Sequence, residues 1–345
     1  MRSNTGILYL MVACLMLLTT ADVQAGDKKR RGTAGSEQLL IPLTARSTAL
    51  GQAATSGLMG MTGLEALASN PAALSLNNGT NAMFSRMEYV ADIGVNYFGI
   101  AQRLGNNNLA LTVSSWDFGD IPLQTELNPE VSNVTWTASY VTVGASYARN
   151  FTDRIAAGFT AKVVNERIDD VSSSGVAFDA GMTYLVGESG LRFGVSLKNF
   201  GPDRQFSGTG LVQFAQLPGQ NPDAQPQAVV IEGAAYEMPS LLNFGTAYTR
   251  QLGSGAVVTV LGNFRSNSFS QDQFSGGLEL GFRNILFVRG GFQYEEDMDL
   301  TFYNGANFGA GLNLDLGGNT LIVDYAYRST DFFDNVQMVT VNVVL

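Results

Sequence analysis

The sequence predicts an all-β fold: a transmembrane, antiparallel outer-membrane β-barrel of about 14 strands with a small N-terminal plug segment. Three observations predict it. Segments of about ten residues alternate apolar and polar side chains, as in 321–328 (LIVDYAYR), which is the period of a strand with two unlike faces. Short and longer connections alternate between these segments. The chain also begins with an apolar run typical of an export signal.

The N-terminal signal is the first expected element. Arg2 precedes the 12-residue apolar run 7–18, and the small residues Val23 and Ala25 predict a signal peptide, 1–25, cleaved near Ala25. The run is too short to span a bilayer as a helix, and no later apolar run approaches the roughly 18 residues of a helical span. We therefore expect export to the outer membrane of a diderm bacterium. Cys14 leaves a lipoprotein acceptor open as an alternative.

Residues 26–83 are expected to form a periplasmic tail and a plug in the barrel lumen, ahead of the barrel at 84–345. The basic cluster 28–31 directly follows the predicted cleavage site. It fits a solvated tail, with a periplasmic docking role as the alternative. Residues 33–74 are rich in Ala, Gly and Leu, and they show neither strand alternation nor a spanning run. Short helices or a compact plug inside a barrel would account for both properties.

The strands follow the plug. The expected ranges are 84–91, 93–104, 107–117, 138–150, 154–168, 174–187, 190–200, 239–251, 254–266, 272–283, 285–295, 301–315, 319–329 and 335–345. Connections after the even-numbered strands are tight, whereas those after the third and later odd-numbered strands are mostly longer: 118–137, 169–173, 201–238, 267–271, 296–300 and 330–334. Outer-membrane barrels combine short periplasmic turns with longer outer loops. A soluble β-sandwich, the alternative, has no reason to sort its loops in this way. The short first connection, near Ala91, does not fit the alternation.

Charged residues within the alternating segments are expected to face the lumen, and the apolar residues are expected to face lipid. A sheet crosses a bilayer only as a closed barrel, because every backbone group needs a partner. An Arg or Lys on the lipid face costs roughly 2–4 kcal/mol at the bilayer midplane. The expected lumen charges are Arg192, Lys198, Glu279, Arg289, Asp315, Asp324 and Arg328.

Composition argues against several functional classes. The formal net charge of −10 disfavours a nucleic-acid partner. The chain has no histidine, and its one cysteine, Cys14, lies in the signal, so the commonest general base and thiol chemistry are missing. We expect no enzyme activity, no cofactor and no metal site. The acidic stretch 295–299 is expected to be a solvated or cation-binding loop tip, with a specific calcium site as the alternative.

Part of the plug segment resembles a known family. The motifs are 33–35 (TAG), 41–51 (IPLTARSTALG) and 70–74 (NPAAL). They are similar to the opening of the PorV/PorQ family, outer-membrane barrels whose architecture is similar to that of FadL-type fatty-acid transporters. The Asn-Pro-Ala step is shared with that wider group. This sequence departs from the family pattern at Thr44, Ala73 and 57–63.

The resemblance implies a non-catalytic component of type IX-like protein secretion. Such a component would bind translocon subunits and the C-terminal domains of cargo proteins within the lipid of the outer membrane. The alternative is a FadL-like channel for long-chain fatty acids or other hydrophobic small molecules. The residues themselves do not choose between the two.

Two groups of residues are candidates for these roles. The plug or gating candidates are Arg46, Gly51, Asn70, Pro71 and Ala72. Arg46 lies in an apolar stretch and would need an acidic or carbonyl partner if buried, whereas Asn70-Pro71 is typical of a turn. The partner-binding candidates lie in the long loop 201–238, which is apolar in part and too long for a simple connection. They are Phe206, Leu211, Phe214 and Pro218.

Overall fold

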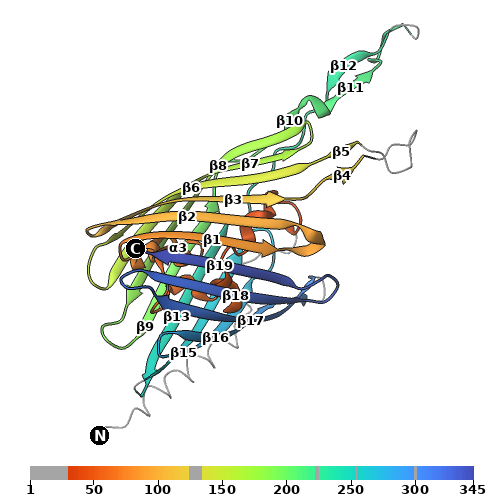
Figure 1. Cartoon of the computed structure of the whole chain (residues 1–345). Coiled ribbons are helices and arrows are strands. Elements are labelled where there is room, and N and C mark those ends of the chain that lie inside the picture. The colour runs from red at the N-terminus through yellow and green to blue at the C-terminus, as the bar shows by residue number, and fades with distance from the viewer. Residues whose placement is uncertain (1–29, 124–133, 222–224, 254, 299–300) are drawn as a thin grey trace.

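The computed structural model describes residues 30–123, 134–221, 225–253, 255–298 and 301–345. The predicted signal peptide, Lys28, Lys29 and Asp299 lie outside these ranges. Within them, the chain forms a closed antiparallel barrel of 14 strands (Figure 1). Because β1 pairs with β19 along its whole length, from Asn81↔Val344 to Glu88↔Gln337, the ring has no free edge.

The barrel strands follow one another around the ring in chain order. They are β1 (Thr80–Glu88), β2 (Gly94–Leu104), β3 (Asn107–Asp117), β6 (Ala138–Asn150), β7 (Ile155–Ile168), β8 (Val171–Leu185), β9 (Leu191–Phe200), β13 (Leu241–Leu252), β14 (Ala256–Asn267), β15 (Gln273–Phe282), β16 (Leu286–Glu295), β17 (Tyr303–Asp315), β18 (Thr320–Thr330) and β19 (Val336–Val344).

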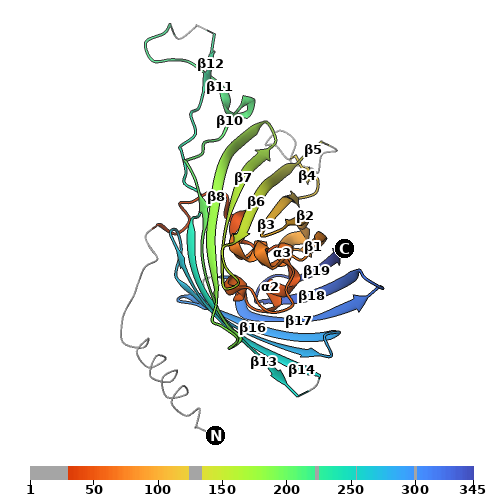
Figure 2. The ribbon, with the colours of Figure 1, turned by 90° about the vertical axis from the view of Figure 1, so that its left-hand side faces the viewer.

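Smaller elements extend two of the connections. The connection after β3 carries a hairpin of β4 (Ile121–Pro122) and β5 (Thr135–Trp136). The connection after β9 carries β10 (Ser207–Gly208), which pairs with β8, then η6 (Thr209–Leu211) and a hairpin of β11 (Val212–Ala215) and β12 (Gln227–Val230). This second hairpin projects well beyond the barrel rim in both views (Figures 1 and 2).

The barrel has two unlike ends. One end, here called the turn end, carries the tight connections and the C-terminal Leu345. The other, the outer end, carries the long connections after β3 and β9, as expected of an outer-membrane barrel. The alternation of loop lengths is less regular than the sequence predicts. β8 begins at Val171, so the connection after β7 is only Asp169-Asp170, which turns tightly with Asp169 at φ 51°. β1 begins at Thr80, four residues before the expected start.

The two faces of the wall have opposite chemistry. In β18, Asp324, Ala326 and Arg328 point inward and are at most 6% exposed, whereas Tyr325 points outward and is 39% exposed. The same alternation places Phe308 and many other large apolar side chains on the outer face. Such a surface is unfavourable in water and is stabilised when an apolar medium covers it. This is the lipid-facing wall that the alternating pattern predicts.

The lumen is filled by short helices of the plug segment, drawn in orange inside the ring (Figure 2). They are η2 (Glu37–Leu40), α2 (Ala45–Ala49), η3 (Ala54–Ser56), α3 (Gly63–Leu67) and η4 (Pro71–Leu76). Another short helix, η5 (Val90–Asp92), lies in the β1–β2 connection. None of the helices within the described ranges has the length and apolar character that a bilayer crossing requires.

The start of the plug segment lies at the outer end, not at the turn end where a periplasmic tail would lie. Arg30 forms an ion pair with Glu237 at 2.6 Å, and the Gly35 amide donates to the Glu237 carbonyl. Arg30 also lies over the ring of Phe269. These partners belong to connections at the outer end, so the described part of the tail is held there by charge and ring contacts.

Candidate functional site

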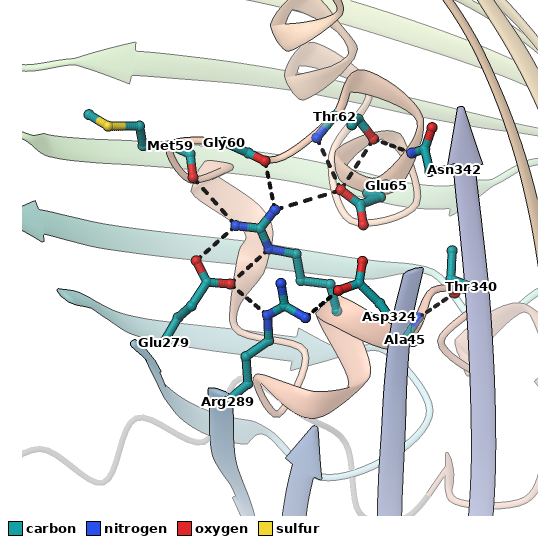
Figure 3. Close-up of polar contacts among 11 residues, drawn as sticks. Ala45, Met59, Gly60, Thr62, Glu65, Glu279, Arg289, Asp324, Thr340 and Asn342 are labelled. Carbon is teal, nitrogen blue, oxygen red and sulfur yellow. Dashed lines mark hydrogen bonds and ion pairs between the residues drawn. The ribbon is translucent and has the colours of Figure 1, made fainter. Parts of the chain in front are cut away.

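The centre of the lumen holds a buried ionic network that joins the plug to the wall (Figure 3). Arg46 on α2 is 2% exposed, and its Nε and Nη2 each donate to one carboxylate oxygen of Glu279 on β15 at 2.8 Å. Arg289 on β16 donates to the same carboxylate at 2.6 Å and also pairs with Asp324 on β18. Two-pronged contacts between guanidinium and carboxylate groups are strong and directional. Arg46 thus has the acidic partner that a buried plug arginine needs.

Glu65 on α3 is the fifth member of this central network. It caps its own helix, because its carboxylate accepts from the Thr62 amide at 3.0 Å, and it lies 3.8 Å from Arg46 Nη1. Burial raises the pKa of Glu65, the neighbouring carboxylate of Asp324 raises it further, and Arg46 opposes both effects. The network contains two guanidinium groups and three carboxyl groups. When Glu65 is protonated, the two positive and two negative charges of the network balance.

The charge of Arg46 is secure in this setting. Burial by itself would lower the pKa of Arg46, but the carboxylates of Glu279 and Glu65 outweigh it, and the net direction is upward. The plug is consequently attached by a permanent cation. Its partner on the wall, Glu279, has both oxygens occupied by arginine donors.

The Asn-Pro-Ala step forms a second attachment point. The side chain of Asn70 accepts from the Ala72 amide at 3.0 Å, which starts η4 with Pro71 in its first turn. The amide nitrogen of Asn70 donates to the backbone of Thr55 in the plug and to the carbonyl of Met182 on the wall. Pro71 and Ala72 are buried against β7. The expected turn therefore also fastens the plug to the wall.

Small residues let the plug approach the wall closely. Gly51, with φ +64°, lies against Gly291 on β16, where an added Cβ would sit 2.3 Å from the Gly51 nitrogen. Glycine suits both positions: Gly51 adopts a left-handed backbone conformation, and Gly291 has no side chain to obstruct the plug. The fit at this point therefore depends on the two glycines.

A third polar cluster lies at the outer end and was missed by sequence reasoning. Arg204, from the long loop after β9, is 3% exposed and pairs with Glu166 on β7 at 2.9 Å. Arg204 also donates to the Ser36 hydroxyl, while Gln38 and Tyr236 both donate to the Glu166 carboxylate. This outer cluster ties three separate segments together: the start of the plug, the long loop and the barrel wall.

Aromatic rings surround an open cavity of about 660 Å³ at the outer end. Tyr89 meets Trp116 edge-on at 5.4 Å, and Phe118 meets Tyr140 edge-on at 4.9 Å. We call this cavity the outer vestibule. Its rings are Tyr89, Trp116, Phe118, Tyr140, Phe206, Tyr236, Phe302 and Tyr303.

A smaller cavity of about 100 Å³ lies deeper in the lumen and is here called the inner cavity. Gln38, Leu40 and Ile41 line both cavities, so the segment around η2 separates one from the other. The inner cavity is walled largely by hydroxyl side chains from β3, β6 and β7. These are Thr112, Ser114, Thr142, Ser146 and Thr160. The charged residues Lys162, Asp179, Lys198 and Arg265 also line it.

The other expected lumen charges are distributed along the barrel. Lys198 and Arg328 face the lumen interior, and Arg328 lies over the Tyr303 ring with 3.2 Å between guanidinium carbon and ring centre. Arg192 faces inward near the turn end. Asp315 differs from the expectation: it lies exposed at the turn end, where its carboxylate accepts from Gly317 and caps the turn. The alternation along β17 points Asp315 to the lumen side. Because Asp315 is the last residue of the strand, its side chain lies at the barrel rim and is exposed.

The loop candidates separate into two groups. Phe206 stacks on Tyr236 at 5.6 Å and belongs to the vestibule. Leu211 is partly buried at the base of the projecting hairpin. Phe214, 76% exposed, and Pro218 lie on the projecting hairpin and its tip, away from the vestibule.

Several site residues could have been found from the sequence and others could not. Thr62 and Glu65 match the capping-box pattern, and Arg265 has the inward parity of its strand. Arg204 lies in an irregular loop, where the sequence has no repeating pattern from which the direction of its side chain could be predicted. As for metals, the described residues contain no group of three or more acidic, histidine or cysteine side chains placed to hold an ion.

Several solved barrel structures are similar to this chain. No protein-family model and no curated protein sequence matches the chain. A monoaromatic hydrocarbon channel, CymD, is similar with a TM-score of 0.56 at 11% identity, covering 88% of this chain and 97% of CymD. The toluene transporter TodX of Pseudomonas putida gives 0.50 at 13% identity, covering 86% and 95%.

A FadL homologue of Pseudomonas aeruginosa gives a TM-score of 0.50 at 9% identity, with 88% of this chain and 98% of the homologue covered. At such identities the similarity concerns the fold, and it extends over nearly the full length of each matched structure. The chain therefore shares the fold of these solved structures, a closed antiparallel barrel of 14 strands.

Proposed function

We propose that this protein is an outer-membrane channel that admits small hydrophobic molecules, with the outer vestibule as the point of capture. The observation that carries the proposal is the position of the aromatic vestibule. It lies at the outer end and shares lining residues with the inner cavity, from the segment around η2 and from Trp116 on β3. Aromatic side chains give a large apolar contact area that suits a flat or apolar solute.

The fold supports the same proposal. The structures that this chain resembles are described as a monoaromatic hydrocarbon channel and a toluene transporter. These structures favour transport. The resemblance of residues 33–74 to the PorV/PorQ family would instead imply a role in type IX secretion. We further propose that the mature chain starts after Ala25 and resides in the outer membrane, which N-terminal sequencing of purified outer membranes would test.

We propose that solute leaves the lumen through the wall at the outer-end part of β8, residues 171–177. β9 ends at Phe200, after a register shift between Phe178 and Ala180, so β8 has no β9 partner before Phe178. The short strand β10 pairs with β8 at Val171 and Ser172, and loop residues fill the rest of this part of the wall, with Arg204 packed against Gly175. A wall closed by a loop can open with less loss of backbone hydrogen bonds than one closed by a strand.

Uptake of labelled toluene into cells that express the protein in their outer membrane tests the proposal. We expect Trp116→Ala to lower the rate severalfold, because Trp116 lines both cavities. Phe308→Ala is the matched control, since Phe308 is 56% exposed on the lipid face. Uptake no faster than in cells without the protein would refute the proposal.

A second function, binding a protein partner in secretion, is favoured by one feature. The projecting hairpin carries Phe214 and Val230, which are 76% and 70% exposed, on one face. Isolated two-stranded hairpins are marginally stable, and a partner would cover this face. Co-purification of translocon subunits from detergent-solubilised outer membranes, lost in Phe214→Ser, would favour this function.

A further inference from the structure

Most of the strongly buried cations in the lumen have a carboxylate partner. Arg46 and Arg289 pair with Glu279, and Arg204 pairs with Glu166. Lys162, in the wall of the inner cavity, pairs with Asp179 at 2.7 Å. This is the expected pattern, because a cation removed from water loses hydration energy that a carboxylate can restore.

Lys198 and Arg265, which face the inner cavity, depart from the pattern, as does Arg328, which lies outside that cavity and contacts Gln293 and the Tyr303 ring. Among the described residues, neither Lys198 nor Arg265 lies within 4.0 Å of a carboxylate oxygen. Lys198 Nζ donates to the Ala68 carbonyl at 2.7 Å. Arg265 donates only to the side-chain amides of Asn243, Gln273 and Gln52, at 2.9–3.2 Å. Neutral oxygens orient these two cations, and neither is paired directly with a carboxylate of the described residues.

Lys198 and Arg265 both line the inner cavity, although they lie on different strands. Lys198 lies on β9 and Arg265 on β14, on either side of β13, and Asn243 on β13 pairs in register with Arg265. Both side chains line the inner cavity together with the Lys162–Asp179 pair. Counting these four charged residues, the cavity wall carries an excess of two positive charges. Glu295, whose charge also acts on Arg265, accepts a hydrogen bond from Gln273 at 2.6 Å.

We propose that the inner cavity is a binding site for the oxyanion group, carboxylate or phosphate, of a small solute, held by Lys198 and Arg265. The hydroxyls of Ser114, Thr142 and Ser146 complete the site by donating to the remaining oxygens. A cavity of about 100 Å³ is well below the roughly 300–1,000 Å³ of pockets for larger organic ligands. The site therefore suits a compact anionic group and has no room for a long alkyl chain.

This inference deepens the proposed transport function and rests on it for the route by which the solute arrives. A solute with an apolar body would meet the aromatic vestibule first. Its anionic group would then be drawn to the inner cavity past η2. The site thus adds affinity for solutes that carry an anionic group, while neutral apolar solutes would still be captured by the vestibule alone.

Calorimetric titration of the detergent-purified protein tests the site. The probes are acetate, its neutral isostere acetamide, and inorganic phosphate. We expect acetate or phosphate to bind and acetamide not to bind. Arg265→Gln and Lys198→Met should each weaken binding at least tenfold, while the charge-conserving Arg265→Lys should retain most of it. Acetate and phosphate titrated separately distinguish a carboxylate site from a phosphate site.

Arg192→Gln is the matched control, because Arg192 faces inward near the turn end and lies outside the inner cavity. Its binding should equal that of the unaltered protein. Equal binding of acetate and acetamide, or undiminished binding in both Arg265→Gln and Lys198→Met, would overturn the anion site. Toluene uptake, measured separately, reports on the proposed function: uptake without anion binding removes only this inference, and anion binding without uptake removes only the transport proposal.

Discussion

At the scale of single residues, the central network decides how firmly the plug is held. Arg46 and Glu279 make a two-pronged contact between α2 and β15, and both side chains are buried. Removing one partner of such a pair leaves the other charge buried without compensation, which costs more than the intact pair contributes. Single substitutions in this network should therefore have large effects.

Arg46→Gln is expected to destabilise the folded barrel by about 3–5 kcal/mol. The physical reason is that Glu279 loses two charge-assisted hydrogen bonds and keeps only Arg289. Thermal unfolding, followed by the mobility shift of the barrel on gel electrophoresis, would measure the loss. Arg283→Gln, an exposed arginine in a tight turn, should leave the transition unchanged. A melting temperature equal to that of the unaltered protein would contradict the assigned role of Arg46.

Glu65 should make plug attachment sensitive to pH. Burial, followed by the nearby Asp324, raises the pKa of Glu65 from 4.5 to about 8. A carboxyl group with a raised pKa in the folded state favours folding in its protonated form. Its contribution is complete below about pH 4.5 and is lost as the pH rises towards 8. The plug should therefore become looser over this range.

Protease cleavage within residues 57–63, compared at pH 5 and pH 8, measures that loosening. We expect faster cleavage at pH 8 in the unaltered protein. Glu65→Gln, which mimics the protonated form, should show much less change between the two pH values. Identical pH dependence in the two proteins would show that Glu65 is not the titrating group.

At the scale of elements, the plug fits the wall through shape as well as charge. α2 packs on β16, β17, β18 and β19, and η4 packs on β3, β6, β7 and β8. At Gly291 the wall lacks a side chain, and the plug backbone at Leu50-Gly51 occupies that space. The plug backbone therefore comes closest to the wall where a wall residue lacks a side chain.

Gly291→Ala is expected to displace the plug while leaving the strands paired. Its Cβ would lie 2.3 Å from backbone atoms at Leu50-Gly51, a separation that forces movement. Conductance across planar bilayers should rise as the lumen opens. Gly290→Ala is the matched control, since nothing lies within 4 Å of an added Cβ there. Equal conductance in the two variants would mean that the plug does not close the lumen at this point.

At the scale of the whole molecule, the apolar outer wall determines where the protein can be stable. Closure of the ring by β1 and β19 satisfies the backbone internally, and the outward side chains then require an apolar surrounding. The extent of this outer surface makes a water-soluble monomer unfavourable.

Val260→Arg is expected to destabilise the barrel in lipid by roughly 2–4 kcal/mol if Val260 lies near the bilayer midplane. Val260 points outward in the middle of β14 and is 52% exposed. Leu316→Arg, in an exposed turn beyond the end of β17, should cost much less. Refolding into vesicles at graded urea concentrations would compare them. Equal costs at the two positions would contradict the assignment of a lipid-facing wall.

The strands were predictable because alternation along one strand is a local property. All 14 expected segments correspond to barrel strands, since an apolar face for lipid and a polar face for the lumen repeat every two residues. Strand ends were less predictable: β1 and β8 begin at Thr80 and Val171, because the backbone ladder continues through 80–83 and 171–173, where the apolar–polar alternation is weak. Arg46 could be named as a buried plug cation, but its partner Glu279 is 233 residues away in the chain.

By itself, the sequence determined that this chain forms strands with one apolar and one polar face and that a short, helical segment precedes them. These properties depend on residues close together in the chain. Only the tertiary structure decided which charges meet. It paired Arg46 with Glu279 and Arg204 with Glu166, left Lys198 and Arg265 facing a cavity without a carboxylate partner among the described residues, and turned the start of the plug towards the outer end. The physical reason is that electrostatic energy depends on distance through space, which strand periodicity does not encode.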